Sequence, residues 1–260
     1  MHRLFRSLSL VVLALCCGLA PSAGAAGPVV LFDQGHGQRF VIEETGDLHL
    51  SQFAEVFRAA GYQVRSTAAP LSGQSLAGVD VVVTSGLFQP YGPDELAALL
   101  GFVGQGGGLA VMLHIAPTYA NLLQGLGVLA SQGVLNEGEG VLEGNPLNFR
   151  VTSFSKHPLT AGLERFSLYG GWAVMDSGRD GAVKTVAFTS RSSWIDADRD
   201  RQRGAQEVLH AYGVLVAGER GKGRFAVFGD DAIFQNRFLD EANRKLAANL
   251  ASWLSKGREI

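Results

Sequence analysis

Residues 106–114 read Gly-Gly-Gly-Leu-Ala-Val-Met-Leu-His, and this stretch does most to decide the fold. The glycines end the helical pattern before them, residues 109–113 form a continuous apolar run, and a histidine follows at once. A run that is apolar on both faces is typical of a central strand in a parallel sheet. The stretch therefore predicts a buried strand with His114 at its carboxyl end.

The segments before this strand repeat the alternation of strand and helix. Residues 28–32 form another apolar run of strand length, and residues 79–83, which are valine except for Asp80, predict a further buried strand. Apolar side chains at helical spacing between Asp47 and Gly61 predict a helix between them, and residues 62–65 predict a strand after it.

Two more predicted helices flank the strand at residues 109–113. Pro93 is followed by two acidic residues, which is a favourable helix start, and another helical pattern covers residues 119–126. Strands that alternate with helices of this length predict a doubly wound, mostly parallel α/β sheet, arranged as a flavodoxin-like three-layer sandwich.

The second half of the chain is less regular. A final apolar strand at residues 225–228 precedes a helix at residues 239–254, whereas residues 193–206 are rich in charge and predict an exposed loop. Short strands are predicted at residues 148–153, 167–174, 183–189 and 212–217.

The amino terminus predicts export. Arg3 and Arg6 precede an apolar run at residues 8–19, and small residues follow at 21–25. This order is typical of a secretory signal peptide. We expect a signal peptide at residues 1–25, an α/β domain at residues 26–260, and a periplasmic or secreted mature protein. No later stretch reaches the ~20 apolar residues that span a bilayer, so we expect no transmembrane segment in the mature chain.

Composition excludes several classes of function. Both cysteines, Cys16 and Cys17, lie in the predicted signal peptide, so the mature chain would have no thiol nucleophile, thiolate ligand or disulfide. The formal net charge of −2 and the lack of a long basic run argue against a nucleic-acid partner.

Four segments resemble the class I glutamine amidotransferase-like superfamily, in particular its trehalose-utilisation (ThuA)-like proteins. The stretch at 106–114 resembles the segment before the nucleophile elbow, and His-Pro-Leu-Thr-Ala-Gly-Leu at 157–163 resembles the signature His-Pro-x-Thr-x-Gly-Leu. GKGRFAVFGDDAIFQN at 221–236, followed by a predicted helix with Asn249 and Trp253, is similar to the last strand and helix of that superfamily. DQGHGQRF at 33–40 resembles exported domains of unknown function related to the extracytoplasmic domains of gliding-motility-type ABC transport systems.

The sequence departs from this superfamily where its chemistry resides. The resemblance implies a cysteine after the strand at 109–113 and a histidine after the last strand. Here His114 and Asp230 stand in those regions. Thiolate attack needs a thiol and a nearby proton acceptor, so we expect no glutamine amidotransferase activity.

Polar residues nevertheless follow the predicted strands. In open α/β sheets, ligands bind outside the carboxyl ends of the strands, where strand order reverses. We therefore predict a ligand-binding crevice, with His114, His36 and Asp230 as the candidate catalytic groups. The predicted ligand-binding residues are Asp33, Gln34, His36, Ser85, His114 and Asp230, with Thr84 and Asp231 beside them.

Each of these residues also has a structural interpretation. His36 could cap a neighbouring element, Asp33 could accept amide bonds from its loop, His114 could be a buried histidine bonded to backbone, and Asp230 could cap residues 232–236. Two histidines and two carboxylates suit zinc or manganese, but none has a local spacing diagnostic of a metal site, so we expect no metal and no cofactor.

Two functional hypotheses follow. The first is a non-catalytic cell-envelope binding or scaffold domain that recognises a small polar, carbohydrate-like ligand or a transport-associated partner. The second is a periplasmic hydrolase or isomerase of a carbohydrate-like substrate, with His114 or His36 as general base and Asp33 or Asp230 orienting it.

Overall fold

The structure is a computed structural model that describes residues 27–179 and 181–255. The predicted signal peptide lies outside these residues. Within the described ranges, no helix has both the length and the apolar character that crossing a membrane requires.

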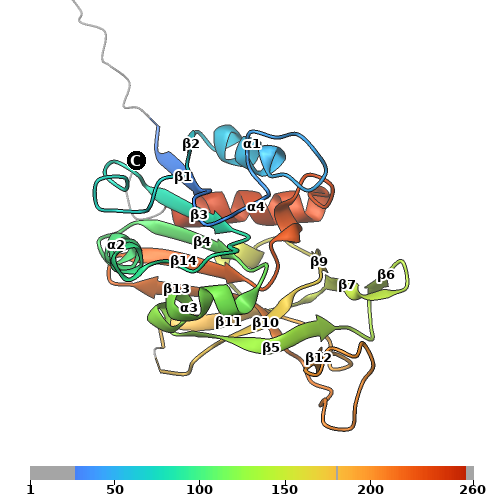
Figure 1. The fold of residues 1–260 in the computed structure, drawn as a ribbon. Helices are drawn as coiled ribbons and strands as arrows, with labels where there is room; N and C mark the ends of the chain where they lie inside the picture. The colour runs from blue at the N-terminus through green and yellow to red at the C-terminus, as the bar shows by residue number, and fades with distance from the viewer. Residues whose placement is uncertain (1–26, 180, 256–260) are drawn as a thin grey trace, which may run out of the picture.

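A mixed sheet of eight strands forms the centre of the fold (Figure 1). The first five strands in its spatial order pair in parallel, and the last three add antiparallel strands to one edge. The order is β2 (Gln63–Thr67), β1 (Val29–Asp33), β3 (Val81–Ser85), β4 (Gly108–Met112), β14 (Gly223–Phe228), β13 (Gly213–Arg220), β11 (Val183–Phe188) and β8 (Ser153–Phe154).

Helices pack on both faces of this sheet. The helices α1 (Ser51–Ala59) and α4 (Glu241–Leu254) contribute to one hydrophobic core, whereas α2 (Pro93–Gly104) and α3 (Ala120–Leu126) contribute to the other. A short 3₁₀ helix, η1 (Ala116–Tyr119), precedes α3. The predicted helix at 119–126 is thus confirmed, with one extra turn before it.

Strand β1 shows why the central runs are apolar throughout. Val30 and Phe32 belong to the core beneath α1 and α4, and Val29 and Leu31 to the core beneath α2 and α3. Successive side chains of a strand point to opposite faces, so a strand covered on both faces is apolar along most of its length, and in β1 the polar Asp33 comes only at the carboxyl end. The α/β class predicted from the sequence is confirmed.

The second half supplies the parallel strand β14, but its other strands pair antiparallel and two of the three sheets are antiparallel. The sheet expected to be mostly parallel is therefore mixed. One sheet has the order β10 (Trp172–Asp176), β5 (Val128–Asn136), β12 (Trp194–Asp196). The other has the order β6 (Val141–Leu142), β7 (Asn145–Val151), β9 (Phe166–Tyr169).

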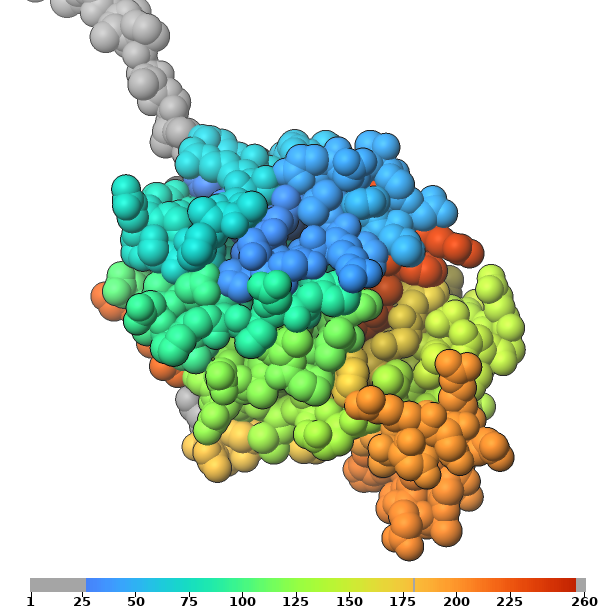
Figure 2. Space-filling model, viewed as in Figure 1, coloured from blue at the N-terminus to red at the C-terminus, as the bar shows by residue number. Residues whose placement is uncertain are grey.

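Two predictions for this half are wrong in part. The single strand expected at 167–174 is two strands, β9 and β10, because Gly170 has a φ of 92° and turns the chain between them. The exposed loop expected at 193–206 begins with a buried segment, since Ser193 is fully buried and β12 follows it. The orange region around residue 200 projects from the body of the protein in Figure 2.

Candidate functional site

The parallel strands bring the predicted site residues to one edge of the sheet. Asp33 ends β1 and pairs in register with Thr84 of β3, and Ser85 pairs with Met112 of β4. His114 follows β4 by two residues, and Asp230 follows β14 by two residues. At this edge, the polar groups form two clusters with different surroundings.

The first is the His36 cluster, made by Asp33, His36, Gln38, Tyr91 and Glu95. The ring of His36 lies between two carboxylates, with Nδ1 3.0 Å from Oδ2 of Asp33 and Nε2 3.0 Å from Oε1 of Glu95. Tyr91 donates its hydroxyl hydrogen to Asp33 at 2.6 Å, and the side-chain amide of Gln38 also donates to Asp33. Every polar atom of the His36 ring is therefore paired within the protein.

Electrostatic attraction between His36 and its two carboxylates stabilises the His36 cluster. Burial opposes the charged form of His36, but the bonds and the negative charges of Asp33 and Glu95 outweigh it and raise the histidine pKa. Burial likewise opposes ionisation of Glu95, yet the amide of Gly92 and His36 lower the pKa of that carboxyl. Because His36 is only 6% exposed and has no free nitrogen, its geometry favours a structural role over ligand binding.

Gln34 takes no part in the His36 cluster. Its side-chain amide donates to Glu43, and its side-chain oxygen accepts the backbone N–H of Ile42. These bonds connect the loop after β1 to the segment that contains Ile42 and Glu43. The predicted ligand-binding residue Gln34 is therefore occupied in joining two loop segments.

The second is the His114 cluster, made by Phe40, Phe88, His114, Asp230 and Asp231. Nδ1 of His114 lies 3.1 Å from Oδ1 of Asp231, and the rings of Phe40 and Phe88 lie 5.8 and 4.9 Å from the imidazole. The His114 side chain is 35% exposed, whereas Asp231 is buried. Within the described residues, Nε2 of His114 has no hydrogen-bond partner, so it is open to a ligand.

Asp231 favours the protonated form of His114. The hydrogen bond that His114 Nδ1 donates to Asp231 raises the pKa of His114 against the opposing effect of burial. The backbone oxygen of His114 accepts a hydrogen bond from the Trp172 indole at 3.0 Å, which fixes the chain after β4. The carboxylate that orients His114 is Asp231 and not Asp230, which corrects the pairing expected from the sequence.

Asp230 is only 1% exposed, in contrast to the half-buried His114. Its carboxylate accepts the backbone N–H groups of Tyr169 and Ala232, so it joins β9 to the short helix η3 (Ala232–Phe234). Burial and the neighbouring charge of Asp231 raise the pKa of Asp230 to about 7. These contacts agree with the capping interpretation of Asp230.

Three buried oxygens at this edge of the sheet lack partners among the described residues. They are Oγ1 of Thr84, Oγ of Ser85 and Oδ2 of Asp231. Gly86 lies beside Asp231, and a Cβ added to this glycine would stand 2.9 Å from Oδ2. Buried polar atoms are rarely left unpaired, so Oδ2 of Asp231 makes the His114 cluster the better candidate for a polar ligand.

The sequence did not predict Gln38, Tyr91 and Glu95 of the His36 cluster or Phe40 and Phe88 of the His114 cluster, and it gave Asp231 less weight than Asp230. Glu95 and Tyr91 come from the start of α2 and the loop before it, so no strand-end pattern includes them. Asp231 was judged less significant than its neighbour, although it is the residue that contacts His114. Its position in the Gly229-Asp230-Asp231 turn was the available signal, but the sequence does not show which carboxylate faces the histidine.

The protein also has a groove of about 660 Å³ beside α3. Ala116, Leu123, Val128 and Arg220 are among its lining residues, and none of the predicted site residues lines it. It lies next to the chain that leaves His114 through η1, but it is separate from the His114 cluster.

The pH dependence of stability tests the buried state of Asp230. Its pKa rises from 3.8 to about 7 on folding, so between these values only the folded state holds the proton. Stability must then fall as pH rises through this window, by up to about 1.4 kcal/mol per pH unit, and level off above it. Asp230→Asn is expected to flatten the slope of unfolding free energy against pH, measured by urea unfolding between about pH 5 and 6.5.

Most other ionisable groups do not contribute to the pH dependence of stability in this window. His36 and His114 have raised pKa values, so the stability that they contribute is lost only above 6.5. Asp94→Asn is the matched control, because Asp94 is an exposed aspartate at the start of α2. An unchanged slope in Asp230→Asn would show that this carboxyl ionises normally in the folded protein.

Comparison with known sequences identifies a family for most of the chain. Residues 49–251 match the family described as "Domain of unknown function (DUF4350)". No curated protein shows significant sequence similarity.

Solved structures show the same kind of fold. The mmIFT52 N-terminal domain has a TM-score of 0.70 at 17% identity, over 89% of this chain and 99% of that one. A putative ThuA-like protein from Bacteroides uniformis has a TM-score of 0.56 at 15% identity, over 90% and 95%. A cytoplasmic protein from Salmonella typhimurium LT2 has a TM-score of 0.57 at 14% identity, over 88% and 100%. These similarities support a ThuA-like fold, and at such low identity they carry no function.

Proposed function

Because the chain belongs to the DUF4350 family, whose description assigns no reaction, we propose its function from the His114 cluster. The protein is a non-catalytic binding domain of the cell envelope that recognises a small polar, carbohydrate-like ligand. We further propose that its fold is a flavodoxin-like member of the amidotransferase-like superfamily. The strand order β2-β1-β3-β4-β14 is the order of flavodoxin-like sheets, which supports this assignment.

One observation carries the proposal. The His114 side chain is partly exposed, its ring lies near those of Phe40 and Phe88, and Asp231 binds its Nδ1. Its Nε2 has no hydrogen-bond partner among the described residues. Aromatic rings suit the apolar faces of a sugar ring, and an imidazole with nearby carboxylates suits its hydroxyl groups. No thiol accompanies this histidine, since both cysteines of the chain lie at residues 16 and 17.

The cellular setting of the proposal comes from the sequence. A signal peptide at residues 1–25 would place the domain in the periplasm or outside the cell. The resemblance of residues 33–40 to extracytoplasmic domains of gliding-motility-type transport systems supports an envelope transport component as an alternative partner. A partner would be recognised without the His114 cluster, so the two versions differ in their response to mutation.

Replacing His114 with alanine is expected to weaken ligand binding at least about tenfold, or ~1.4 kcal/mol. The substitution removes both the free nitrogen and the ring that packs on Phe40 and Phe88. The measurement is the thermal shift and the calorimetric affinity for a series of monosaccharides, disaccharides and polyols. His210→Ala is the matched control, because His210 is an exposed histidine outside the cluster.

The outcomes separate the alternatives. A ligand that binds wild type and His114→Ala equally would contradict the site. Binding by no member of the series, together with capture of an envelope transport protein by both proteins, would favour the scaffold version.

The His114–Asp231 pair also supports a second candidate, a periplasmic hydrolase or isomerase. A carboxylate that binds one imidazole nitrogen and leaves the other exposed gives the geometry of a general base, and the raised pKa of His114 lies in a suitable direction. Turnover of a glycoside or ester in the same series that disappears in His114→Ala would select this function over simple binding.

A further inference from the structure

The charged loop after β12 contains a regular pattern of acidic residues. Aspartates stand at the first, third and fifth positions of residues 196–207, and a glutamate stands at the twelfth. This is the spacing of the twelve-residue calcium loop of EF-hand proteins, in which those positions supply carboxylate ligands. The four acidic residues are Asp196, Asp198, Asp200 and Glu207.

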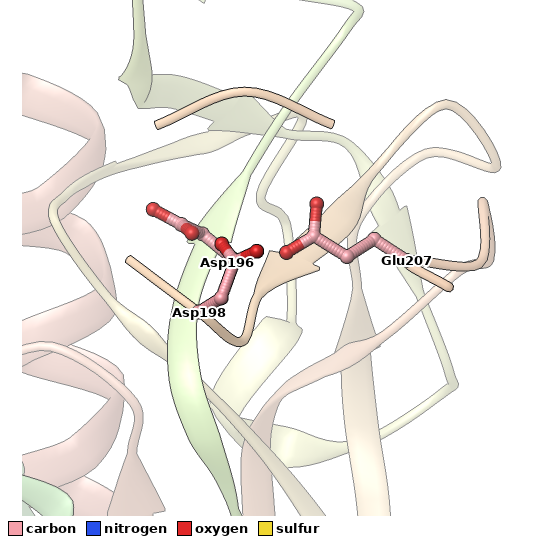
Figure 3. Close-up of side chains that lie close together, drawn as sticks. All are labelled: Asp196, Asp198 and Glu207. Atoms are coloured by element: carbon pink, nitrogen blue, oxygen red, sulfur yellow. The ribbon is translucent and has the colours of Figure 1, made fainter. Parts of the chain in front are cut away.

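The structure brings three of these carboxylates together (Figure 3). One oxygen from each of Asp196, Asp198 and Glu207 lies within 4.8 Å of the other two. Calcium binds oxygen at about 2.3–2.6 Å, so two ligands of one ion stand at most about 5 Å apart. The three oxygens are therefore close enough to share one calcium ion without rearrangement of the loop.

An unpaired buried oxygen points to a missing ligand. Asp196 is 7% exposed, and its Oδ2 accepts the backbone N–H of Arg201, whereas its Oδ1 is buried and has no partner among the described residues. A buried carboxylate oxygen without a hydrogen bond is costly, because its charge has lost the water that solvated it. A bound cation would satisfy this oxygen.

Backbone hydrogen bonds also fix the side chain of Glu207. Its two side-chain oxygens accept the backbone N–H groups of Ala197 and Gly204, each at 2.8 Å. These bonds close the loop, since they join its twelfth residue to its second and ninth. Each carboxylate oxygen has a second lone pair, so Glu207 remains able to bind an ion.

The loop departs from the usual pattern at its sixth position. Calcium loops have glycine there, because the chain turns sharply, but this loop has Arg201. The backbone of Arg201 has a φ of 65°, so it adopts the left-handed conformation that glycine would supply. Arg199, Arg201 and Arg203 are also exposed and oppose the acidic charge.

We propose that residues 196–207 form a calcium-binding loop, with Asp196, Asp198 and Glu207 as side-chain ligands. Calcium fits better than zinc, because the ligands are all hard oxygens. Because the three arginines reduce the negative charge, the expected affinity is that of extracellular calcium modules, with a dissociation constant of roughly 10⁻⁴–10⁻³ M. This site was not expected from the sequence and is separate from the His114 cluster.

The test uses calcium and terbium on the full protein. Calcium at ~10 mM, above the expected dissociation constant, should raise the melting temperature by several degrees, and magnesium should raise it less. Terbium should luminesce on excitation of Trp194, which precedes Asp196 by two residues on β12. Calcium should displace it, and Trp194→Phe should remove the luminescence while preserving the calorimetric calcium affinity.

Substitutions make the test specific. Asp196→Asn and Glu207→Gln should abolish the calcium response, but both residues also anchor the loop backbone. Asp198→Asn is the second variant, because Asp198 is exposed and should leave the fold intact while weakening calcium at least tenfold. Arg201→Gly should strengthen calcium binding, since it removes a positive charge and supplies the usual glycine. Glu164→Gln, an exposed acid elsewhere, is the control.

The contrary results are equally clear. Absence of a calcium-induced shift in wild type would overturn the proposal. So would a calcium response in Asp198→Asn and Asp196→Asn equal to that of wild type and Glu164→Gln, because the ion would then bind elsewhere.

Discussion

Replacing His36 with alanine is expected to lower the free energy of unfolding by about 3–5 kcal/mol near pH 6. The imidazole lies between Asp33 and Glu95, and the Asp33 side chain is fully buried. Removing the positive partner leaves a buried carboxylate with only neutral donors, including the hydroxyl of Tyr91. The cost therefore comes from an uncompensated charge as well as from lost packing. Urea unfolding measures it.

The role of charge can be separated from the role of shape. The pKa of His36 is higher in the folded protein than its ordinary value of 6.5. Its stabilising effect is therefore present below pH 6.5 and is lost as the pH rises through the pKa that His36 has in the folded state. The difference between wild type and His36→Ala should therefore shrink at alkaline pH. A double-mutant cycle of His36→Gln with Glu95→Gln should show a coupling energy, and additive effects would contradict the proposed ion pair. His210→Ala should change stability by less than ~0.5 kcal/mol.

Replacing Asn243 with leucine is expected to cost about 3 kcal/mol or more, the second largest effect. Asn243 is fully buried in α4, and its side-chain oxygen accepts the backbone N–H of Ser167 in β9. Its amide group donates to the backbone oxygens of Ser167, Ile233 and Phe238. Leucine has a similar volume but leaves these backbone groups buried and unpaired.

This substitution also affects the candidate site. Ile233 lies in η3, directly after the turn that carries Asp230 and Asp231, so loss of the bond loosens the segment that orients His114. Thermal and urea unfolding measure the stability loss. Asn249→Leu on the same helix is the matched comparison, because Asn249 is only half-buried and donates to two backbone oxygens. A loss no greater than that of Asn249→Leu would show that the buried network matters little.

The predictions from sequence were best where a local pattern repeats. The apolar runs of β1, β3, β4 and β14 predicted buried parallel strands, and each strand lies within a few residues of its expected place. The antiparallel strand β5 was missed, because its exposed and buried positions do not alternate regularly, and its partners β10 and β12 lie far along the chain.

The candidate site was predicted only in outline. The sequence placed Asp33, His36, His114 and Asp230 at one edge of the sheet, since parallel strands share the direction of their carboxyl ends. It left open whether each histidine was structural or available. The residues around each histidine answer this question. Glu95, from α2, binds Nε2 of His36, whereas Nε2 of His114 has no partner among the described residues.

The sequence by itself determined the α/β class, the absence of cysteine after residue 17 and the polar character of the strand ends. These features depend on residue identity and on short-range periodicity, which are local. Only the tertiary structure decided that Asp231 and not Asp230 orients His114, that His36 is enclosed by two carboxylates, and that Asp196 and Glu207 meet across a loop. These pairings depend on how distant segments pack, because hydrogen bonds and charges act over a few ångströms in space, whatever the separation along the chain.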